Sequence, residues 1–350
     1  MNEELNRLLK INALEVDNEI NNILPKEFNI DWFNSIFGRS NWEYDYQSCA
    51  ESITKPIFNL LKRGGKRWRP YLMKLSYNAV GGKEDIKRFL PIPELIHNGT
   101  LIIDDIEDNS DLRRSEPCIH KLYGTDIAIN VGNSLYYLPL MIIIKDKSLD
   151  IKKKEKIYEI INEEMIKISF GQGLDIYWHN NDCCVTENQY LQMCAFKTGT
   201  LARLSAKLGA ILGDGTNDEI NYLGSFAETI GIAFQIQDDI LNITNKDWGK
   251  VLGDDICEGK KSLMVIHTLE KCDNNDRQRL FDILSMKTKD KELITEAITI
   301  MKKYNSIDYA KNKAKNLVKS AWKNINKTIP ESESKKKLKL FAEYLINRDI

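Results

Sequence analysis

Apolar residues recur at intervals of three or four along most of the chain, with polar and charged residues between them. The segment from Ile157 to Ile168, IYEIINEEMIKI, is one example, and its spacing is typical of a helix with one buried face. Alternating β-branched residues between turn residues, which would predict strands, are nearly absent. The pattern predicts an all-α protein, a bundle of about ten or more helices.

The breaks between these helical stretches are polar or glycine-bearing segments, and none is a long linker rich in Pro, Gly or Ser. We therefore predict one large helical domain, residues 50–350, after an N-terminal helical extension, residues 1–49. The longest apolar run, from Leu135 to Ile144, has ten residues. A membrane-spanning helix needs about twenty, so we interpret this run as a buried core helix.

The amino-acid composition and net charge exclude several classes of protein. Of 350 residues, 42% are hydrophobic and 29% are charged, which is the profile of a folded globular protein. Fifty basic residues against 51 acidic ones give a net charge of -1, so no overall field favours nucleic acid or an anionic membrane. The seven cysteines show no CxxC or Cys/His ligand spacing, and the first twenty residues lack a secretory-signal pattern. We expect a reducing, cytoplasmic location.

The segment from Leu101 to Arg114, LIIDDIEDNSDLRR, gathers carboxylates at the end of an apolar helical stretch. Asp104 and Asp108 are four residues apart, hence on one helical face, and Asp105 is adjacent. Like charges at this spacing repel, so an exposed helix gains nothing from them. Oxygen ligands without His or Cys suit Mg²⁺, which keeps waters and substrate phosphates as further ligands. Taken alone, the segment could equally be an acidic helix end on the surface.

A second segment, FQIQDDILNI, repeats the arrangement with Asp238 and Asp239. If the two helices face each other, their carboxylates can clamp two or three metal ions around one diphosphate. Basic residues that can bind phosphate oxygens accompany both segments: Lys66, Arg67, Arg69, Arg113, Arg114, Lys197 beside Thr198, Lys250 and Lys260. Any one of them taken alone is more simply a solubilising side chain. Together they predict two anion sites, one bridged by metal ions and one purely cationic.

From about Ala50 to Ile350 the chain resembles the trans-isoprenyl diphosphate synthases, which include farnesyl and geranylgeranyl diphosphate synthases. It is most similar to the short-chain eukaryotic geranylgeranyl enzymes. The family's motifs occur in order: GGKRWRP, DDIEDNSDLRR, PCIHKLYG, GQGLDI, FKTGT, FQIQDDILN and GDDICEGKKS. The resemblance implies the isoprenoid synthase fold, with helices around a deep central cavity, and a homodimer.

The resemblance also implies that residues 50–350 form a catalytic domain that joins isopentenyl diphosphate to dimethylallyl, geranyl or farnesyl diphosphate. The five aspartates of the two motifs would hold three Mg²⁺ on the allylic diphosphate: Asp104, Asp105, Asp108, Asp238 and Asp239. The other catalytic residues would be Arg113, Lys197 and Lys260 at this diphosphate, Thr198 and Gln235 beside the reacting carbon, and Lys250 as a further cation. Gln172 and Asp175 would support this centre, or serve as buried polar contacts between helices.

The isopentenyl diphosphate pocket implied by the resemblance consists of Gly65, Lys66, Arg69, His97 and Arg114. His97 could equally be a core histidine, which is the more frequent fate of a lone one. At the third position of the second motif, Asn242 stands where many relatives have Asp, so direct metal ligation there is less favoured.

Product length is interpreted from Gly99 and Thr100, which lie about one helical turn before Asp104. Farnesyl-forming relatives have bulky aromatic residues at these positions. The small pair therefore predicts an open pocket and a C20 product, geranylgeranyl diphosphate, with a deeper floor at Tyr136, Tyr137 or His120. A bifunctional farnesyl/geranylgeranyl or longer-chain polyprenyl synthase is the alternative.

Two other functions fit the sequence less well. A class I terpene cyclase has an NSE- or DTE-like second motif and no use for a second, cationic diphosphate site. A non-catalytic partner subunit would be expected to lack metal ligands, whereas both aspartate motifs are intact here.

Overall fold

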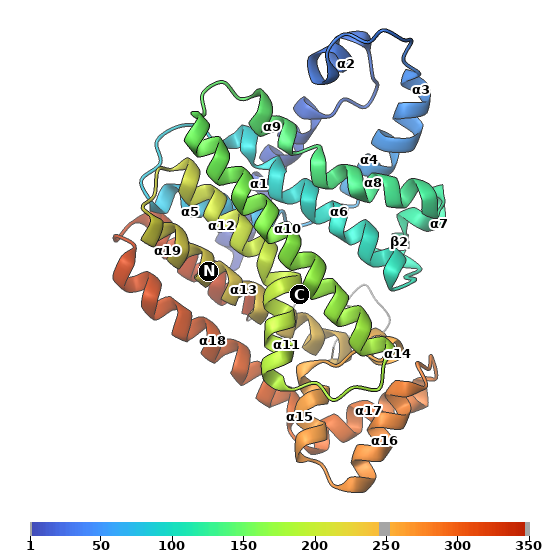
Figure 1. The fold of residues 1–350 in the computed structure, drawn as a ribbon. Helices are drawn as coiled ribbons and strands as arrows, with labels where there is room; N and C mark the ends of the chain where they lie inside the picture. Colours follow the sequence, from blue (N-terminus) through green and yellow to red (C-terminus); the bar gives the residue numbers. More distant parts are fainter. Residues whose placement is uncertain (1, 245–252, 347–350) are drawn as a thin grey trace. The chain divides into compact units, whose positions relative to one another are not determined.

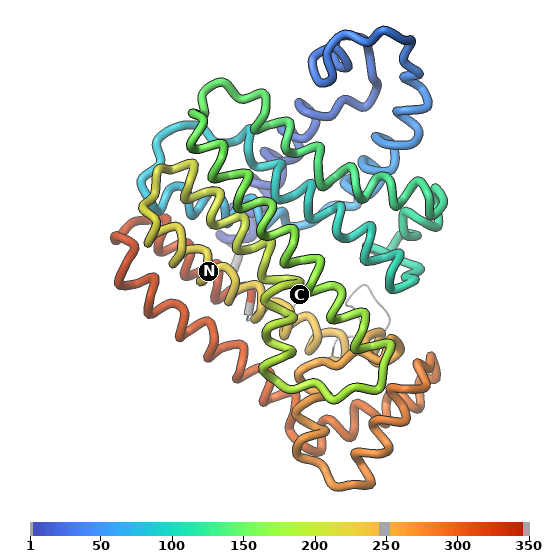
Figure 2. The backbone as a smooth tube through the Cα atoms, in the orientation of Figure 1, coloured from blue at the N-terminus to red at the C-terminus, as the bar shows by residue number. Residues whose placement is uncertain are grey.

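The computed structural model describes residues 2–244 and 253–346. This part of the chain is helical apart from one two-stranded hairpin, which confirms the all-α prediction (Figures 1 and 2). The elements follow in the order α1 (Asn2–Ile23), α2 (Ile30–Phe37), α3 (Tyr46–Cys49), the π-helical turn η1 (Ala50–Thr54), α4 (Lys55–Lys62), α5 (Trp68–Ala79), the 3₁₀ turn η2 (Lys87–Phe89), α6 (Pro91–Glu107), β1 (Leu112–Arg113), β2 (Glu116–Pro117), α7 (Ile119–Tyr123), α8 (Thr125–Tyr137), α9 (Leu140–Lys145), α10 (Ile151–Asn180), α11 (Glu187–Cys194), the π-helical turn η3 (Ala195–Gly199), α12 (Thr200–Leu212), α13 (Asn217–Thr244), α14 (Asp254–Glu258), α15 (Leu263–Lys271), α16 (Asn274–Ser285), α17 (Lys291–Lys303), α18 (Ser306–Thr328) and α19 (Glu333–Ile346).

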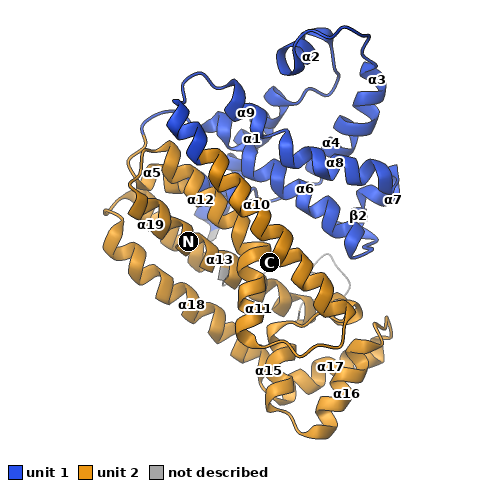
Figure 3. Ribbon diagram, viewed as in Figure 1, with its two compact units in different colours: residues 1–74, 83–156 blue, residues 75–82, 157–350 orange. Residues whose placement is uncertain are grey.

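Backbone contacts divide the chain into two compact units, which Figure 3 colours separately. Unit 1 consists of Met1–Lys74 and Lys83–Lys156, and unit 2 of Leu75–Gly82 and Ile157–Ile350. Helix α1 lies within unit 1 and packs against α6 of the same unit. The boundary after residue 49 therefore remains a prediction about the catalytic domain and is not the division between the units.

The core of unit 1 is the pair α6 and α8, which cross at two glycines. A Cβ on Gly99 would lie 2.9 Å from the carbonyl oxygen of Gly132, and a Cβ on Gly132 would lie 2.7 Å from the Ile103 side chain. Because glycine has no side chain, the two backbones can approach this closely. The crossing fixes the helix that carries the first aspartate motif.

Helix α13 is the centre of unit 2, and α11, η3, α12, α18 and α19 pack against it (Figure 1). Two glycines allow neighbouring helices to pack closely against η3. A Cβ on Gly231 of α13 would lie 2.6 Å from the Cα of Gly199, and a Cβ on Gly171 of α10 would overlap the Lys197 amide nitrogen. The π-helical turn is therefore held by backbone on two sides.

The apolar run from Leu135 to Ile144 does not form the single buried helix expected. Pro139 separates α8 from α9, and whereas Leu135 is fully buried, the side chains of Tyr137 and Ile144 are 69% and 52% exposed. By length and composition, the stretch Thr125–Lys145 is apolar enough to cross a membrane, with a mean hydropathy of 1.6 and a third of it buried. The sequence-based count of consecutive apolar residues missed this longer stretch.

Candidate active site

The first aspartate motif lies at the C-terminal end of α6 in unit 1. Asp104 is in the last turn of the helix and Asp108 caps it, with its backbone N–H donating to the Asp104 carbonyl oxygen at 2.9 Å. Both side chains are partly exposed. The C-terminal end of a helix carries negative partial charge, so the two carboxylates add to an existing negative potential. This end of α6 favours a bound cation.

Asp105 differs from its neighbours because it is only 1% exposed and is paired with Arg113. The Arg113 Nε donates to Asp105 Oδ1 at 2.8 Å, and its Nη2 lies 3.6 Å from Asp104 Oδ2. Burial alone would lower the pKa of Arg113, but the Asp105 and Asp104 carboxylates outweigh it and raise the pKa. Asp104 and Asp108 are therefore the more accessible carboxylates of the motif, whereas Asp105 orients the arginine beside them.

A tight hairpin presents both arginines of the motif. Arg114 and Ser115 form its turn with φ angles of +53° and +63°, the left-handed conformations typical of a two-residue hairpin turn. Arg63 holds the hairpin from the end of α4: its Nη1 donates to the Arg113 carbonyl oxygen at 3.0 Å, and its Nε lies 3.3 Å from a Glu116 carboxylate oxygen. The hairpin thus fixes the backbone positions from which the side chains of Arg113 and Arg114 extend.

A glycine loop brings a second group of basic side chains together in unit 1. Arg114 donates to the Gly64 carbonyl oxygen, and a Cβ on Gly65 would lie 2.8 Å from Arg67 Nη1 and 3.1 Å from Arg114 Nη2. With a φ of +145°, Gly65 also adopts backbone geometry that other residues rarely reach. The loop requires glycine so that the guanidinium groups can gather around it.

Within this group, Arg67 has a structural role that sequence analysis did not assign. It is 2% exposed, and its guanidinium pairs with Glu94 at 3.0 Å and with Asp17 of α1 at 3.1 Å. The Asn12 side chain donates to the Arg67 carbonyl oxygen at 3.0 Å. Helix α1 thereby supports the loop.

Arg69, Arg114 and His97 form a cluster without enough negative charge to balance it. Burial, together with repulsion between neighbouring arginines, lowers the pKa of both Arg69 and Arg114 to about 10. Burial and four surrounding guanidinium groups lower the pKa of His97 well below its ordinary value. Arg69 Nε is buried and has no hydrogen-bond partner among the described residues. This pattern is typical of a site that gains stability when an anion binds.

Unit 2 carries a chain of hydrogen bonds through the second aspartate motif. The Thr198 hydroxyl donates to Gln235 Oε1 at 2.7 Å, and Gln235 Nε2 donates to Asp239 Oδ1 at 2.8 Å. The Tyr190 hydroxyl donates to the other oxygen, Oδ2, at 2.7 Å. Three predicted residues, Thr198, Gln235 and Asp239, are therefore linked directly, and the rotamer of Asp239 is fixed from both sides.

The two aspartates of this motif lie in different surroundings. Asp238 is partly exposed, whereas Asp239 is buried. Burial, followed by repulsion from Asp255, raises the pKa of Asp239 to about 7, although the hydrogen bonds from Tyr190 and Gln235 oppose the shift. A cation near these carboxylates would favour the ionised form of Asp239 and lower its pKa. Binding of a cation would therefore relieve the repulsion between Asp239 and Asp255.

The predicted lysines of unit 2 are held by carboxylates. Lys197 Nζ lies 2.6 Å from Asp175 Oδ2. Lys260 pairs with Glu258 and lies 3.9 Å from Asp255 Oδ1. Lys250, predicted as a further cation, lies outside the described residues.

Asn242 and Gln172, the two amides noted in the sequence, differ in what the structure shows. The Asn242 side-chain oxygen accepts the Asp255 backbone N–H at 3.3 Å, and its carbonyl accepts the Gly253 N–H at 2.9 Å. Asn242 therefore anchors the start of α14. Gln172 is partly exposed on α10, one turn before Asp175.

Sequence reasoning missed several residues that shape the site: Arg63, Tyr190, Asp255, Gly171 and Gly231. Asp255 carries a sequence signal, because it is an acid within the motif GDDICEGKKS. Tyr190 has none, since a tyrosine on an apolar helix face is usually core. The two glycines are visible in the sequence, but the close approach that requires them is a property of the packing.

The product-length positions differ in their surroundings. Gly99 is buried at the crossing with α8, where its missing side chain makes room for Gly132. Thr100 is partly exposed, and its hydroxyl donates to the His97 carbonyl oxygen at 2.8 Å. Close packing of α6 against α8 is therefore sufficient to explain why residue 99 is a glycine. Of the two small residues, Thr100 is the one with an accessible side chain.

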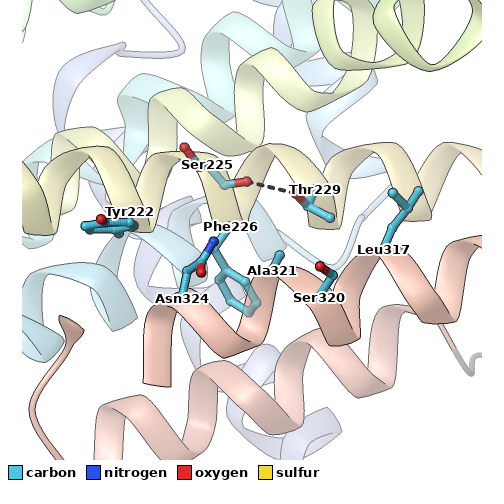
Figure 4. A pocket seen from close by; sticks show the side chains of 8 residues that line it. All are labelled: Tyr222, Ser225, Phe226, Thr229, Leu317, Ser320, Ala321 and Asn324. Atoms are coloured by element: carbon cyan, nitrogen blue, oxygen red, sulfur yellow. Dashed lines mark hydrogen bonds between the residues drawn. The ribbon is translucent and has the colours of Figure 1, made fainter. Parts of the chain in front are cut away.

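In the described residues, the two aspartate motifs included, neither a metal-ligand cluster nor the surface groove marks a metal or diphosphate site. No three His, Cys, Asp or Glu side chains among them are placed to hold a metal ion together. A groove of about 220 Å³ lies between α13 and α18, lined by residues such as Tyr222, Phe226 and Leu317 (Figure 4). Its lining has no charged side chain, so it offers nothing to a diphosphate.

Comparison with known proteins gives consistent matches over most of the chain. The profile of the polyprenyl synthetase family matches residues 50–301. A short chain isoprenyl diphosphate synthase of Methanocaldococcus jannaschii is 41% identical over 72% of this chain and 76% of that protein. A geranylgeranyl pyrophosphate synthase of Dictyostelium discoideum is 32% identical over 82% of this chain and 91% of its own length. The crystal structure of geranylgeranyl pyrophosphate synthetase from Pyrococcus horikoshii has a TM-score of 0.85 and 31% identity, and the match covers 99% of both chains.

Proposed function

Because the chain belongs to the polyprenyl synthetase family of trans-prenyltransferases, we propose that it joins isopentenyl diphosphate to an allylic diphosphate. The proposed final product is geranylgeranyl diphosphate, with dimethylallyl, geranyl and farnesyl diphosphates as primers. A bifunctional farnesyl/geranylgeranyl or longer-chain synthase is the alternative within the same reaction class.

One observation carries the proposal: a cationic cluster and a carboxylate pair share a single helix in unit 1. His97 of the cluster and Asp104 of the pair are seven residues apart on α6, about 10 Å along the axis. This spacing suits two separate diphosphates, one bound by arginine alone and one through metal ions. A terpene cyclase, which uses one diphosphate, has no need of the first site.

The donor set fits Mg²⁺, on which this family depends. Asp104, Asp108 and Asp238 are partly exposed carboxylates, and Mg²⁺ takes one or two such ligands together with water and phosphate oxygens. We propose that both motifs contribute to three ions, with Asp105 and Asp239 completing the set. When bound, Mg²⁺ neutralises the allylic diphosphate and makes it a better leaving group.

Side chains of the protein would then stabilise the departing diphosphate and position the two substrates. Arg113, Lys197 and Lys260 offset the negative charge that grows on the departing diphosphate. Thr198 and Gln235 lie beside the allylic cation. The C3=C4 double bond of isopentenyl diphosphate attacks this cation, and the released diphosphate accepts the proton from C2. Arg69 and Arg114, with Lys66 and the Gly65 backbone, hold isopentenyl diphosphate during the attack.

We also propose a homodimer and a cytoplasmic location. On α10, the side chains of Ile166, Phe170 and Tyr177 are 60%, 67% and 61% exposed and follow one helical face. Monomers rarely expose such a stripe, so a second copy is the proposed cover. All seven cysteines are free, which supports a reducing compartment.

The proposed function is tested by steady-state kinetics with paired substitutions. Asp104→Asn should lower kcat by at least about a hundredfold, because removing a charge-stabilising group costs that much in comparable sites. Arg69→Gln should raise KM for isopentenyl diphosphate about tenfold or more and leave KM for the allylic substrate unchanged. Asp111→Asn is the matched control, since this exposed aspartate follows Asp108 by three residues and pairs with Lys121 at 3.3 Å. Equal effects of Arg69→Gln on both KM values would contradict the two-site assignment.

A further inference from the structure

The π-helical turn η3 of unit 2 is connected to a buried ion cluster that the reaction scheme does not use. Thr200, directly after the turn, is fully buried, and its hydroxyl donates to the carbonyl oxygen of Ala195 at 3.3 Å. This contact spans the whole turn, from its first residue to the residue after its last. The hydroxyl is therefore placed to hold the turn closed.

Arg203, one turn further along α12, donates a hydrogen bond to the same hydroxyl. Its Nη2 donates to Thr200 Oγ1 at 3.2 Å, and its Nε donates to the two carboxylate oxygens of Glu164 at 2.9 and 2.8 Å. Arg203 is 7% exposed and Glu164 is fully buried. A buried pair of this kind fixes geometry more reliably than it adds stability.

The cluster extends to the other helix that contacts η3. Arg203 Nη1 pairs with Glu228 of α13, and Lys167 lies 3.1 Å from Glu164. A Cβ on Gly199 would lie 3.1 Å from the Glu228 Cγ, so this side chain also borders the turn. The ion pairs of Arg203 and Lys167 with Glu228 and Glu164 thus connect α10, α12 and α13 around η3.

We propose that Glu164, Arg203 and Thr200 form a brace that sets the shape of η3. The inference rests on the proposed function, because η3 matters for catalysis only if Lys197 and Thr198 act there. These two side chains lie on a turn one residue wider than an α-helix, so relaxation of the turn would rotate both away from Asp175 and Gln235. The brace residues are positioning residues, since they act through the turn.

The test compares Thr200→Val, which removes the hydroxyl with little change of shape, with Thr200→Ser, which keeps it. Thr200→Val should lower kcat at least about tenfold, because small misplacements of reacting groups have effects of this size, with KM for isopentenyl diphosphate unchanged. Thr200→Ser should retain kcat within about threefold. Arg203→Lys should also lower kcat, and the double variant Thr200→Val/Arg203→Lys should lose less than the product of the two single losses.

Thr268→Val is the matched control. Thr268 is fully buried in α15 of the same unit and donates its hydroxyl to the Met264 carbonyl oxygen at 2.7 Å. A loss of melting temperature like that of Thr200→Val, with kcat unchanged, supports the proposal. Equal kcat for Thr200→Val and Thr268→Val, or failure of Thr200→Ser to restore kcat, overturns it.

Hydrogen exchange separates the brace from the reaction. The amides of Ala195–Gly199 should exchange faster in Thr200→Val than in wild type or Thr268→Val, whether or not the protein makes product. Unchanged exchange overturns the brace. Inactive wild-type protein with faster exchange in the variant would overturn the proposed function and leave the brace standing.

Discussion

At the residue scale, the cationic cluster of unit 1 shows how a binding site differs from a merely charged surface. Arg67 has two carboxylate partners, Glu94 and Asp17. For Arg69 and Arg114, in contrast, burial and then neighbouring guanidinium groups lower the pKa to about 10, although Glu94 opposes the shift. The sequence could not separate these arginines, because the partners of Arg67 come from distant segments. The uncompensated charge in the folded protein is the reason why Arg69 and Arg114 are the proposed anion-binding pair.

The same cluster predicts a pH dependence of stability through His97. Its pKa in the folded protein lies well below 6.5, the ordinary value it regains on unfolding. Below pH 6.5, His97 therefore binds a proton in the unfolded chain but not in the folded chain. The free energy of unfolding consequently falls as the pH decreases. The expected loss is up to about 1.4 kcal/mol for each pH unit. His97→Gln should lose less stability than wild type between pH 7 and pH 5.5.

Urea unfolding at the two pH values measures this difference. Inorganic pyrophosphate serves as the control, because a bound anion offsets the arginine charges and should reduce the pH dependence of the wild type. Identical pH dependence in wild type and His97→Gln would show that neither burial nor the surrounding arginines lower the pKa of His97 in the folded protein.

At the scale of single elements, sequence periodicity predicted a helical chain and placed Asp104 and Asp108 on one helical face, at the end of what is α6 in the structure. It could not predict the π-helical turn η3, against which the backbones of α10 and α13 pack closely at Gly171 and Gly231. It also could not distinguish Gly99 from Thr100, since small residues occur both where helices pack closely and where a pocket is open. Local rules therefore recover helices and motif faces, whereas close contacts between helices decide the remaining geometry.

The crossing of α6 and α8 yields a prediction about product length. Thr100→Phe places a ring on a partly exposed position and should shift the product from C20 to C15, while the melting temperature changes little. Gly99→Ala should instead destabilise the fold, because its Cβ would lie 2.9 Å from the Gly132 carbonyl oxygen. The expected cost is about 1–3 kcal/mol.

Chromatography of the dephosphorylated products and thermal unfolding separate the two effects. Thr100→Ser is the control, since it preserves a small side chain and should keep the C20 product. A C20 product from Thr100→Phe would show that this position does not limit chain growth.

At the scale of the whole molecule, the exposed stripe on α10 predicts self-association. Phe170→Glu places a charge within the apolar face of Ile166, Phe170 and Tyr177 and should convert dimers to monomers, as measured by light scattering during gel filtration. Glu163→Gln is the matched control, because Glu163 lies on the same exposed side of α10. Monomeric wild-type protein at micromolar concentration would contradict the proposal.

The product of the whole molecule is identified by a reaction with farnesyl diphosphate as the sole primer. Purified protein is incubated with Mg²⁺, labelled isopentenyl diphosphate and this primer, and the product masses are determined after dephosphorylation. We expect one added five-carbon unit and a dominant C20 alcohol. Products of C25 or longer would contradict the predicted length, and no extension of farnesyl diphosphate would contradict the claim that this chain makes geranylgeranyl diphosphate.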